Sequence, residues 1–509
     1  MINAKSMVIN RILSGSAWIV GGGLLSKGLS FISMALVARL LGKEAYGEFG
    51  LILSTVGMFG VFAGLGLGVT ATKYLAEYRD KDKIKAGRIL GLINISSLIF
   101  GFVVMVICIA FAEYFSNNIF GRDSLEVLIY LAAFMLPLNA WYGVQLGSLA
   151  GFEAFKMIAI VNVIQGVSIP LFVIPLTFYY GIAGGILSQI LNIVVGILVA
   201  NHYIRKCCES YKVTYKFGPF LIEEFFVLSK FSLPSMISMS IVAPTILVTN
   251  AILVNTPGGY GSLGLYSAAN QMRMIILLIP SMISSVLLPI LSERFSNNKN
   301  SYDKISELNI TFIIAIGTPI VMVVYLLSNH FSLLYGGEYT GIAFIIPVIA
   351  LNSLLGLICG CIVNILSSSG SVWASALMNI GWSLLFTLFT YLLVGKYGAI
   401  GLAFSSLFAY QLHMVWQIIY LDRRVIHGII KKNICQLLSF LLITIALSLM
   451  FMYNNRIMKM SYGIFDIIIC LAISSWVIYI FINENMHKDN YSDLKIKIRE
   501  MYRGRLSDD

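Results

Sequence analysis

The stretch Tyr180-Gly181-Ile182-Ala183-Gly184 recurs 217 residues later as Tyr397-Gly398-Ala399-Ile400-Gly401. Residues 42–49, Gly-Lys-Glu-Ala-Tyr-Gly-Glu-Phe, have a counterpart at residues 259–266, Gly-Tyr-Gly-Ser-Leu-Gly-Leu-Tyr. The offset from Gly47 to Gly264 is again 217 residues. Each of the four stretches leads into a long apolar run. Two matches at one offset predict that the chain contains an internal duplication.

Fourteen apolar runs are long enough to cross a bilayer, because a spanning helix needs about 20 apolar residues. These runs lie at residues 12–38, 46–72, 87–112, 125–149, 155–178, 182–203, 225–254, 263–291, 310–327, 342–366, 372–394, 400–421, 434–453 and 463–482. The repeat divides the first twelve into two sets of six. Both sets have the same orientation, since six crossings return the chain to the side where it began.

The predicted fold is an all-α integral membrane protein with 14 transmembrane helices. It consists of two parallel six-helix repeats around a central cavity, plus a C-terminal helix pair. The expected divisions are an N-lobe at residues 1–205, a cytoplasmic linker at 206–224, a C-lobe at 225–422, helices 13 and 14 at 423–483, and a cytoplasmic tail at 484–509.

Charge predicts the orientation of the helices. With the N-terminus inside, the cytoplasmic segments hold 26 of the 35 Lys and Arg residues, and the opposite segments hold 5. Cytoplasmic loops of membrane proteins carry such an excess, so both termini are expected in the cytoplasm. The net charge of +11 therefore reflects topology and gives no reason to expect a nucleic-acid partner.

Composition and motifs argue against a soluble protein and against an enzyme. Hydrophobic residues make up 58% of the chain and charged residues 12%, about half the share of an ordinary soluble domain. The predicted outer loops are short and contain no paired-carboxylate site, zinc motif, nucleophile motif or phosphate-binding loop. Seven cysteines without metal-ligand spacing favour buried thiols. No cofactor is expected.

The candidate binding residues are cations within the predicted spans. Lys27 lies mid-span in the first run, roughly 20 Å from its start at the helical rise, and Arg273 lies roughly 15 Å from the outer end of the eighth. Neither has an acidic residue three or four positions away. A cation at such depth is costly unless it faces water or an anion, so the central cavity is expected to be cationic and its cargo anionic. Alternatively, Lys27 extends to the interface and Arg273 binds a carbonyl or a distant acid. Arg39, at the end of the first run, is a weaker candidate.

Four stretches of the sequence resemble Wzx-type O-antigen and polysaccharide flippases. They are the segment from Ala38 to Phe49, Thr72-Lys73-Tyr74-Leu75-Ala76-Glu77-Tyr78, Gly151-Phe152-Glu153-Ala154-Phe155 and the stretch at 180–184. These belong to the multidrug/oligosaccharidyl-lipid/polysaccharide exporter superfamily. The resemblance covers essentially the whole chain in helix count, repeat and motif order. The motifs identify the superfamily well but separate its branches poorly.

The resemblance implies that the protein moves an undecaprenyl-pyrophosphate-linked oligosaccharide, such as an O-antigen or capsule repeat unit, to the outer leaflet of the bacterial plasma membrane. It implies alternating access, a pyrophosphate contact at Lys27 and Arg273, and partners among membrane lipids and other polysaccharide-assembly membrane proteins. A coupling ion is compatible with it. The alternatives are an ion-coupled multidrug exporter, which usually needs an acidic residue at mid-membrane, and a polysaccharide polymerase or ligase, which needs a large catalytic outer loop.

Overall fold

The computed structural model of the chain describes residues 2–214, 240–274, 276–277, 299–369 and 371–426. Every regular element in this part of the chain is helical, as predicted. The elements are α1 (Ile2–Gly64), α2 (Leu67–Tyr78), α3 (Lys83–Tyr114), the π-helix η1 (Phe115–Phe120), α4 (Leu125–Ala133), α5 (Met135–Gly151), α6 (Phe155–Tyr211), α9 (Val242–Val254), α10 (Gly259–Asn270), α12 (Lys299–Tyr335), the 3₁₀ turn η3 (Gly337–Tyr339), α13 (Ile342–Ser368) and α14 (Val372–Arg424).

Three long helices each contain two predicted runs that are joined at a glycine. α1 has non-helical backbone angles at Gly42 (φ 76°, ψ 168°), α6 at Gly181 (φ 56°, ψ −134°) and α14 at Gly398 (φ 54°, ψ −129°). Residues with a Cβ rarely adopt a positive φ, which explains the glycines. Gly181 and Gly398 have nearly the same conformation and are 217 residues apart. The duplication visible in the sequence is therefore also present in the backbone.

Two predicted runs are interrupted in the structure. The run at 46–72 is broken by Leu65 and Gly66, both with positive φ, so that α2 begins as a separate helix. The run at 125–149 is divided at Phe134 into α4 and α5. Pro137 lies in the first turn of α5, where its missing N–H removes no helical hydrogen bond, and this favours a helix start just before it.

In the described part, seven helical stretches are long and apolar enough to cross a membrane. They pack into buried cores while keeping large apolar side chains on their outer faces. On α3, for example, Phe102, Val103 and Val106 are 52%, 50% and 61% exposed. A contiguous apolar exterior of this kind is suited to lipid. The chain is thus a multi-pass membrane protein.

The predicted helices at residues 434–453 and 463–482 lie outside the described residues, as do parts of the runs at 225–254 and 263–291. The first twelve predicted runs each correspond at least in part to described helix. The predicted total of fourteen remains a prediction.

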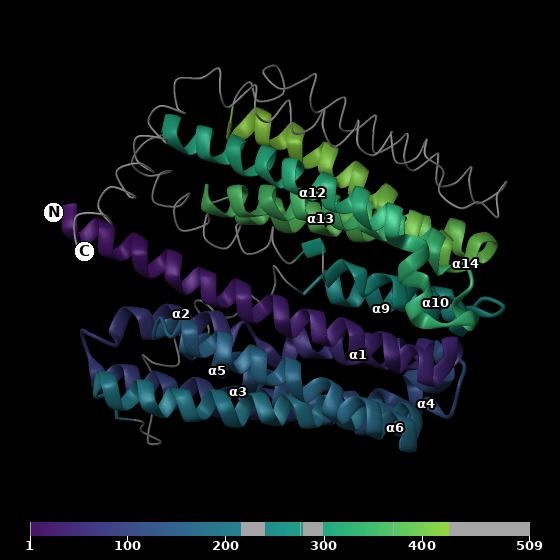
Figure 1. Cartoon of the computed structure of the whole chain (residues 1–509), viewed down its shortest axis with the longest axis horizontal. Coiled ribbons are helices and arrows are strands. Elements are labelled where there is room, and N and C mark those ends of the chain that lie inside the picture. Colours follow the sequence, from purple (N-terminus) through teal and green to yellow (C-terminus); the bar gives the residue numbers. More distant parts are fainter. Residues whose placement is uncertain (1, 215–239, 275, 278–298, 370, 427–509) are drawn as a thin grey trace.

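The helices form two groups, with α1 to α6 on one side and α9 to α14 on the other (Figure 1). The groups meet at the end that holds α4 and α10 and spread apart toward the end that holds α2 and the start of α12 (Figure 1). We call these groups the N-lobe and the C-lobe. The two lobes are therefore in contact at the end that holds α4 and α10 (Figure 1).

Candidate functional site

The lobes meet through a close contact of backbone against backbone. A Cβ atom on Gly47 would overlap the carbonyl oxygen of Tyr260, and a Cβ atom on Gly264 would overlap the carbonyl oxygen of Lys43. These two contacts exchange equivalent residues, because Tyr260 and Lys43 are also 217 positions apart. A Cβ on Gly50 would lie 2.6 Å from Oγ of Ser267, its own equivalent. This reciprocal pattern indicates a pseudo-two-fold axis between Gly50 and Ser267.

Side chains of the C-lobe extend this contact by binding backbone atoms of the N-lobe. The Tyr339 hydroxyl donates to the Ala38 carbonyl at 2.8 Å. The Tyr260 hydroxyl donates to the Phe120 carbonyl at 2.8 Å, and the Asn255 amide donates to the Ile119 carbonyl at 2.7 Å. We call these residues, with the glycine contacts, the lobe junction. Each of its hydrogen bonds must break if the lobes separate at this end.

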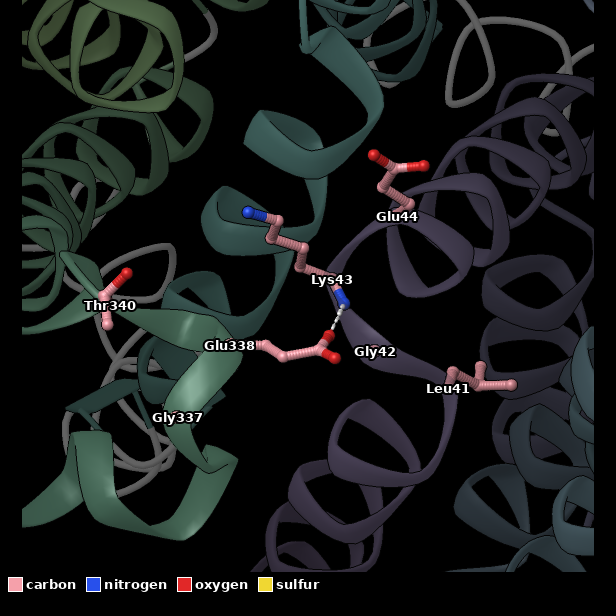
Figure 2. Close-up of a pocket in the computed structure, with 7 residues that line it drawn as sticks. All are labelled: Leu41, Gly42, Lys43, Glu44, Gly337, Glu338 and Thr340. Carbon is pink, nitrogen blue, oxygen red and sulfur yellow. Dashed lines mark hydrogen bonds between the residues drawn. The ribbon is translucent and has the colours of Figure 1, made fainter.

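A surface pocket lies beside the lobe junction, with a volume of about 560 Å³. It is lined by Leu41, Gly42, Lys43, Glu44, Gly337, Glu338 and Thr340. Glu338 reaches across from the C-lobe toward the chain at Gly42, while the ammonium group of Lys43 points away (Figure 2). Oε2 of Glu338 accepts from the backbone N–H of Lys43 at 3.4 Å. This N–H lies just after the Gly42 kink, where a new helical turn leaves donors free.

Arg122 adds a charged contact to the same end of the molecule. Its guanidinium pairs with Glu48 and lies 3.9 Å from Glu44. The guanidinium also lies 4.2 Å from the ring centre of Tyr260, within the range of a cation–π interaction. Glu44 and Glu48 are therefore close to a cation at the lobe junction.

Arg273 lies within the C-lobe, one turn after α10, and its side chain is half-buried. Its polar neighbours are the hydroxyl-bearing side chains of Tyr410 and Tyr266. On α13, a Cβ at Gly356 would lie 3.6 Å from Nη2 of Arg273 and 3.6 Å from Cζ of Tyr410. The guanidinium and the phenol ring thus share the space that this glycine leaves. Among the described residues Arg273 has no ion pair with a carboxylate.

Lys27 lies in the first half of α1 and is half-buried. The helix there packs closely on α6, since a Cβ on Gly166 would lie 2.4 to 2.8 Å from Ser26 and a Cβ on Gly22 would lie 3.0 Å from the Ala159 carbonyl. Like Arg273, Lys27 forms no ion pair within the described part of the chain. The two cations come from different lobes.

Arg39 lies near the lobe junction and is exposed. Its Nε is 3.5 Å from the position that a Cβ on Gly336 would occupy. Arg39 is thus more exposed than Lys27 and Arg273, which are both half-buried.

Sequence patterns singled out Gly47 and Gly264 at the lobe junction. They missed the tyrosines beside Arg273 and the side chains that form hydrogen bonds between the lobes. Tyr266 and Tyr410 are 144 positions apart and meet only because α10 packs against α14. Glu338 lies in a short loop, and no feature of its composition indicates a function. No group of three or more His, Cys, Asp or Glu residues that could hold a metal ion occurs in the described part of the chain.

Comparison with known proteins places these features in a family. The family profile described as "Polysaccharide biosynthesis protein" matches residues 12–295. A Shigella flexneri protein named as an O-antigen transporter is 21% identical over 411 residues, covering 77% of this chain and 94% of that protein. The lipid III flippase of Escherichia coli strain K12 is 25% identical over 142 residues, covering 28% and 34% of the two chains.

A similar fold occurs in a solved structure of the lipid II flippase MurJ in its inward closed conformation. The TM-score is 0.66 at 16% identity, and the match covers 93% of this chain and 98% of that one. At this identity the likeness concerns the fold alone. The family profile, in contrast, matches more than half of the chain. The chain belongs to the polysaccharide biosynthesis protein family.

Proposed function

We propose that this protein flips an undecaprenyl-pyrophosphate-linked oligosaccharide, an O-antigen or capsule repeat unit, from the inner to the outer leaflet of a bacterial inner membrane. Both termini are cytoplasmic in this proposal, and the lobe junction faces outward. The family membership and the names of the two relatives support a lipid-linked oligosaccharide as cargo. The protein acts as a transporter and not as an enzyme.

The observation that carries the proposal is the setting of Arg273. A guanidinium inside a membrane lobe, with tyrosine hydroxyls and no carboxylate beside it among the described residues, is suited to an anion. A diphosphate can accept several charge-assisted hydrogen bonds from a guanidinium. The multidrug alternative needs an interior site of the opposite sign for organic cations, and Arg273 disfavours such cargo.

The arrangement of the lobes supports alternating access. Helices from both lobes interlock at the lobe junction and spread apart toward the other end (Figure 1). In this conformation the headgroup of a lipid-linked sugar enters from the cytoplasmic side. Release outside requires the lobes to separate at the junction, with rocking about the pseudo-two-fold axis. Lys27 and Arg273 approach the diphosphate from opposite lobes, and the glycines Gly47, Gly264, Gly181 and Gly398 provide the close contact and the bends.

The proposal is tested by Lys27→Ala and Arg273→Ala in a strain whose surface polysaccharide depends on this protein. Each variant should reach the membrane at normal levels, because removal of an uncompensated interior cation does not destabilise the fold, and each should abolish surface polysaccharide. Lys27→Arg should keep partial activity, since charge is retained while geometry changes. Lys81→Ala, at an exposed loop position, is the control. Normal polysaccharide in both alanine variants would refute the proposed contact with the diphosphate.

A further inference from the structure

Trp382, in the first half of α14, has a buried indole N–H without a hydrogen-bond partner. The side chain is 5% exposed, and its Nε1 forms no hydrogen bond within the described part of the chain. An indole N–H donates and cannot accept, so only an acceptor can satisfy it. A buried donor without a partner is unfavourable and therefore uncommon in folded proteins. A ligand that brings an acceptor to this position would thus be stabilised.

The two halves of α14 lie side by side around this indole. Trp382 and Tyr410 are 28 positions apart, yet their ring centres are 5.1 Å apart with 45° between the ring planes. Phe389 and Phe408 form a second contact between the halves, with ring centres 6.0 Å apart. Phe386, one turn after Trp382, has its ring centre 5.5 Å from that of the indole. Aromatic rings therefore pack against the indole, while its N–H remains without an acceptor.

Tyr410 connects the indole to Arg273. A Cβ at Gly356 would lie 3.6 Å from Nη2 of Arg273 and 3.6 Å from Cζ of Tyr410, so the guanidinium lies beside the hydroxyl-bearing end of the ring. Arg273 and Tyr410 also interact electrostatically. Trp382 packs against the same tyrosine ring. The three side chains thus form one continuous cluster, contributed by the segment after α10 and by both halves of α14.

The polar groups of this cluster are complementary to an oxyanion. A guanidinium and an indole only donate hydrogen bonds, and a tyrosine hydroxyl can donate or accept. Among the described residues no carboxylate forms an ion pair with Arg273. Phosphate oxygens accept several hydrogen bonds, and those from charged donors are the strongest. A ligand that is itself cationic would satisfy neither the charge of Arg273 nor the donor of Trp382.

We propose that the indole N–H of Trp382 donates to the anionic headgroup held by Arg273, so that both side chains bind one diphosphate beside Tyr410. The inference rests on the proposed function and adds a binding residue to it. The indole is buried against Tyr410 and Phe386, so it loses little freedom when the headgroup arrives. A diphosphate bound in this way joins the segment after α10 to the first half of α14.

The experiment uses the full chain in detergent, with farnesyl diphosphate as the probe and isothermal titration calorimetry as the measure of binding. Trp382→Phe keeps an aromatic ring and removes the N–H. Its affinity for the probe should be about tenfold to a hundredfold lower than that of the wild type, the loss expected for one hydrogen bond to a charged group. Trp373→Phe is the matched control, since Trp373 is 78% exposed, and it should bind as the wild type does. Equal affinity of Trp382→Phe and the wild type would overturn the inference.

Indole spectra detect the hydrogen bond directly, and they cover the case in which Trp382→Phe does not fold. In wild-type protein with nitrogen-15 tryptophan, one indole N–H that exchanges slowly with water should move downfield when the probe is added. Farnesol, which has the same tail and no phosphate, should leave this signal in place. An unchanged signal with saturating probe, or an equal shift with farnesol, would overturn the inference.

Arg273→Gln separates this inference from the proposed function. The variant should lose probe binding, because the guanidinium supplies the charge of the site. Full binding by Arg273→Gln would refute the proposed anion site and the inference with it. Binding that depends on Arg273 but leaves the indole signal unmoved would overturn the role of Trp382 alone.

Discussion

At the scale of single residues, Arg79 shows how the helix ends of the N-lobe are held at the proposed cytoplasmic side. Its Nη1 donates to the Gly151 carbonyl at 2.8 Å, and its Nη2 lies 2.6 Å from Oε1 of Glu153. The guanidinium also lies over the ring of Tyr211 at 5.5 Å. One side chain thus connects the ends of α2, α5 and α6.

We expect Arg79→Ala to lower the free energy of unfolding by about 1–3 kcal/mol, because the buried Gly151 carbonyl loses a charged donor. Burial lowers the pKa of Arg79, but the hydrogen bond and charge of Glu153 outweigh it, and the pKa is raised. A raised pKa of a basic group contributes stability below the unfolded pKa, so this contribution is constant at neutral pH. A thermal unfolding scan in detergent measures the effect. Lys81→Ala, an exposed neighbour, should leave the Tm unchanged, and an equal loss in both variants would contradict the assignment.

At the scale of elements, the glycine bends make a matched pair. Gly181 and Gly398 both have positive φ with strongly negative ψ, a region open essentially to glycine. A Cβ on Gly181 would have no heavy atom within 4 Å, whereas a Cβ on Gly398 would lie 3.0 Å from Oγ of Ser262. An alanine at either position therefore has the same backbone strain, and only at Gly398 does its Cβ also crowd the Ser262 side chain.

Gly181→Ala and Gly398→Ala should each destabilise the protein by about 1–3 kcal/mol, with the larger loss at Gly398. Gly57→Ala is the control, because Gly57 is helical and a Cβ there would have open space. That change should be neutral or slightly stabilising, since alanine favours a helix over glycine. Thermal unfolding of the three variants measures the order of their stabilities. A loss of stability in Gly57→Ala as large as in Gly181→Ala would contradict the role assigned to the bend.

These elements also show what the sequence could and could not predict. The repeat was predictable because the glycines at the bends are required by the backbone and leave a visible motif at residues 180–184 and 397–401. Helix breaks such as the one at Leu65 were not, since a leucine with positive φ has no sequence signal. The neighbours of Arg273 were also hidden, because the contact with Tyr410 depends on how distant helices pack.

At the scale of the whole molecule, the lobe junction determines which end is closed. The close glycine contacts let the backbones of the two lobes touch, and hydrogen bonds from Asn255, Tyr260 and Tyr339 to main-chain carbonyls complete the closure. Because these bonds are aimed at backbone atoms, they depend on the position of the N-lobe helices and little on N-lobe side chains. Such a junction can form and break as a unit while each lobe stays rigid.

The closure predicts a state-dependent cross-link that also tests the orientation. In a cysteine-free background, Gly50→Cys with Ser267→Cys should form a disulfide under mild oxidation, since a Cβ on Gly50 would lie 3.3 Å from the Cβ of Ser267 in this state. Asp80→Cys with Arg424→Cys should not form a disulfide, because these are exposed positions from opposite lobes on the predicted cytoplasmic side.

A membrane-impermeant thiol reagent applied to intact cells should label the single variant Glu338→Cys and spare Asp80→Cys, because the positive-inside charge distribution places residue 80 within the cell. Locking the junction should stop transport, and reduction of the disulfide should restore it, since release outside requires the lobes to part there. Labelling of Asp80→Cys from outside would reverse the orientation, and transport through the locked protein would exclude the lobe junction as the outer gate.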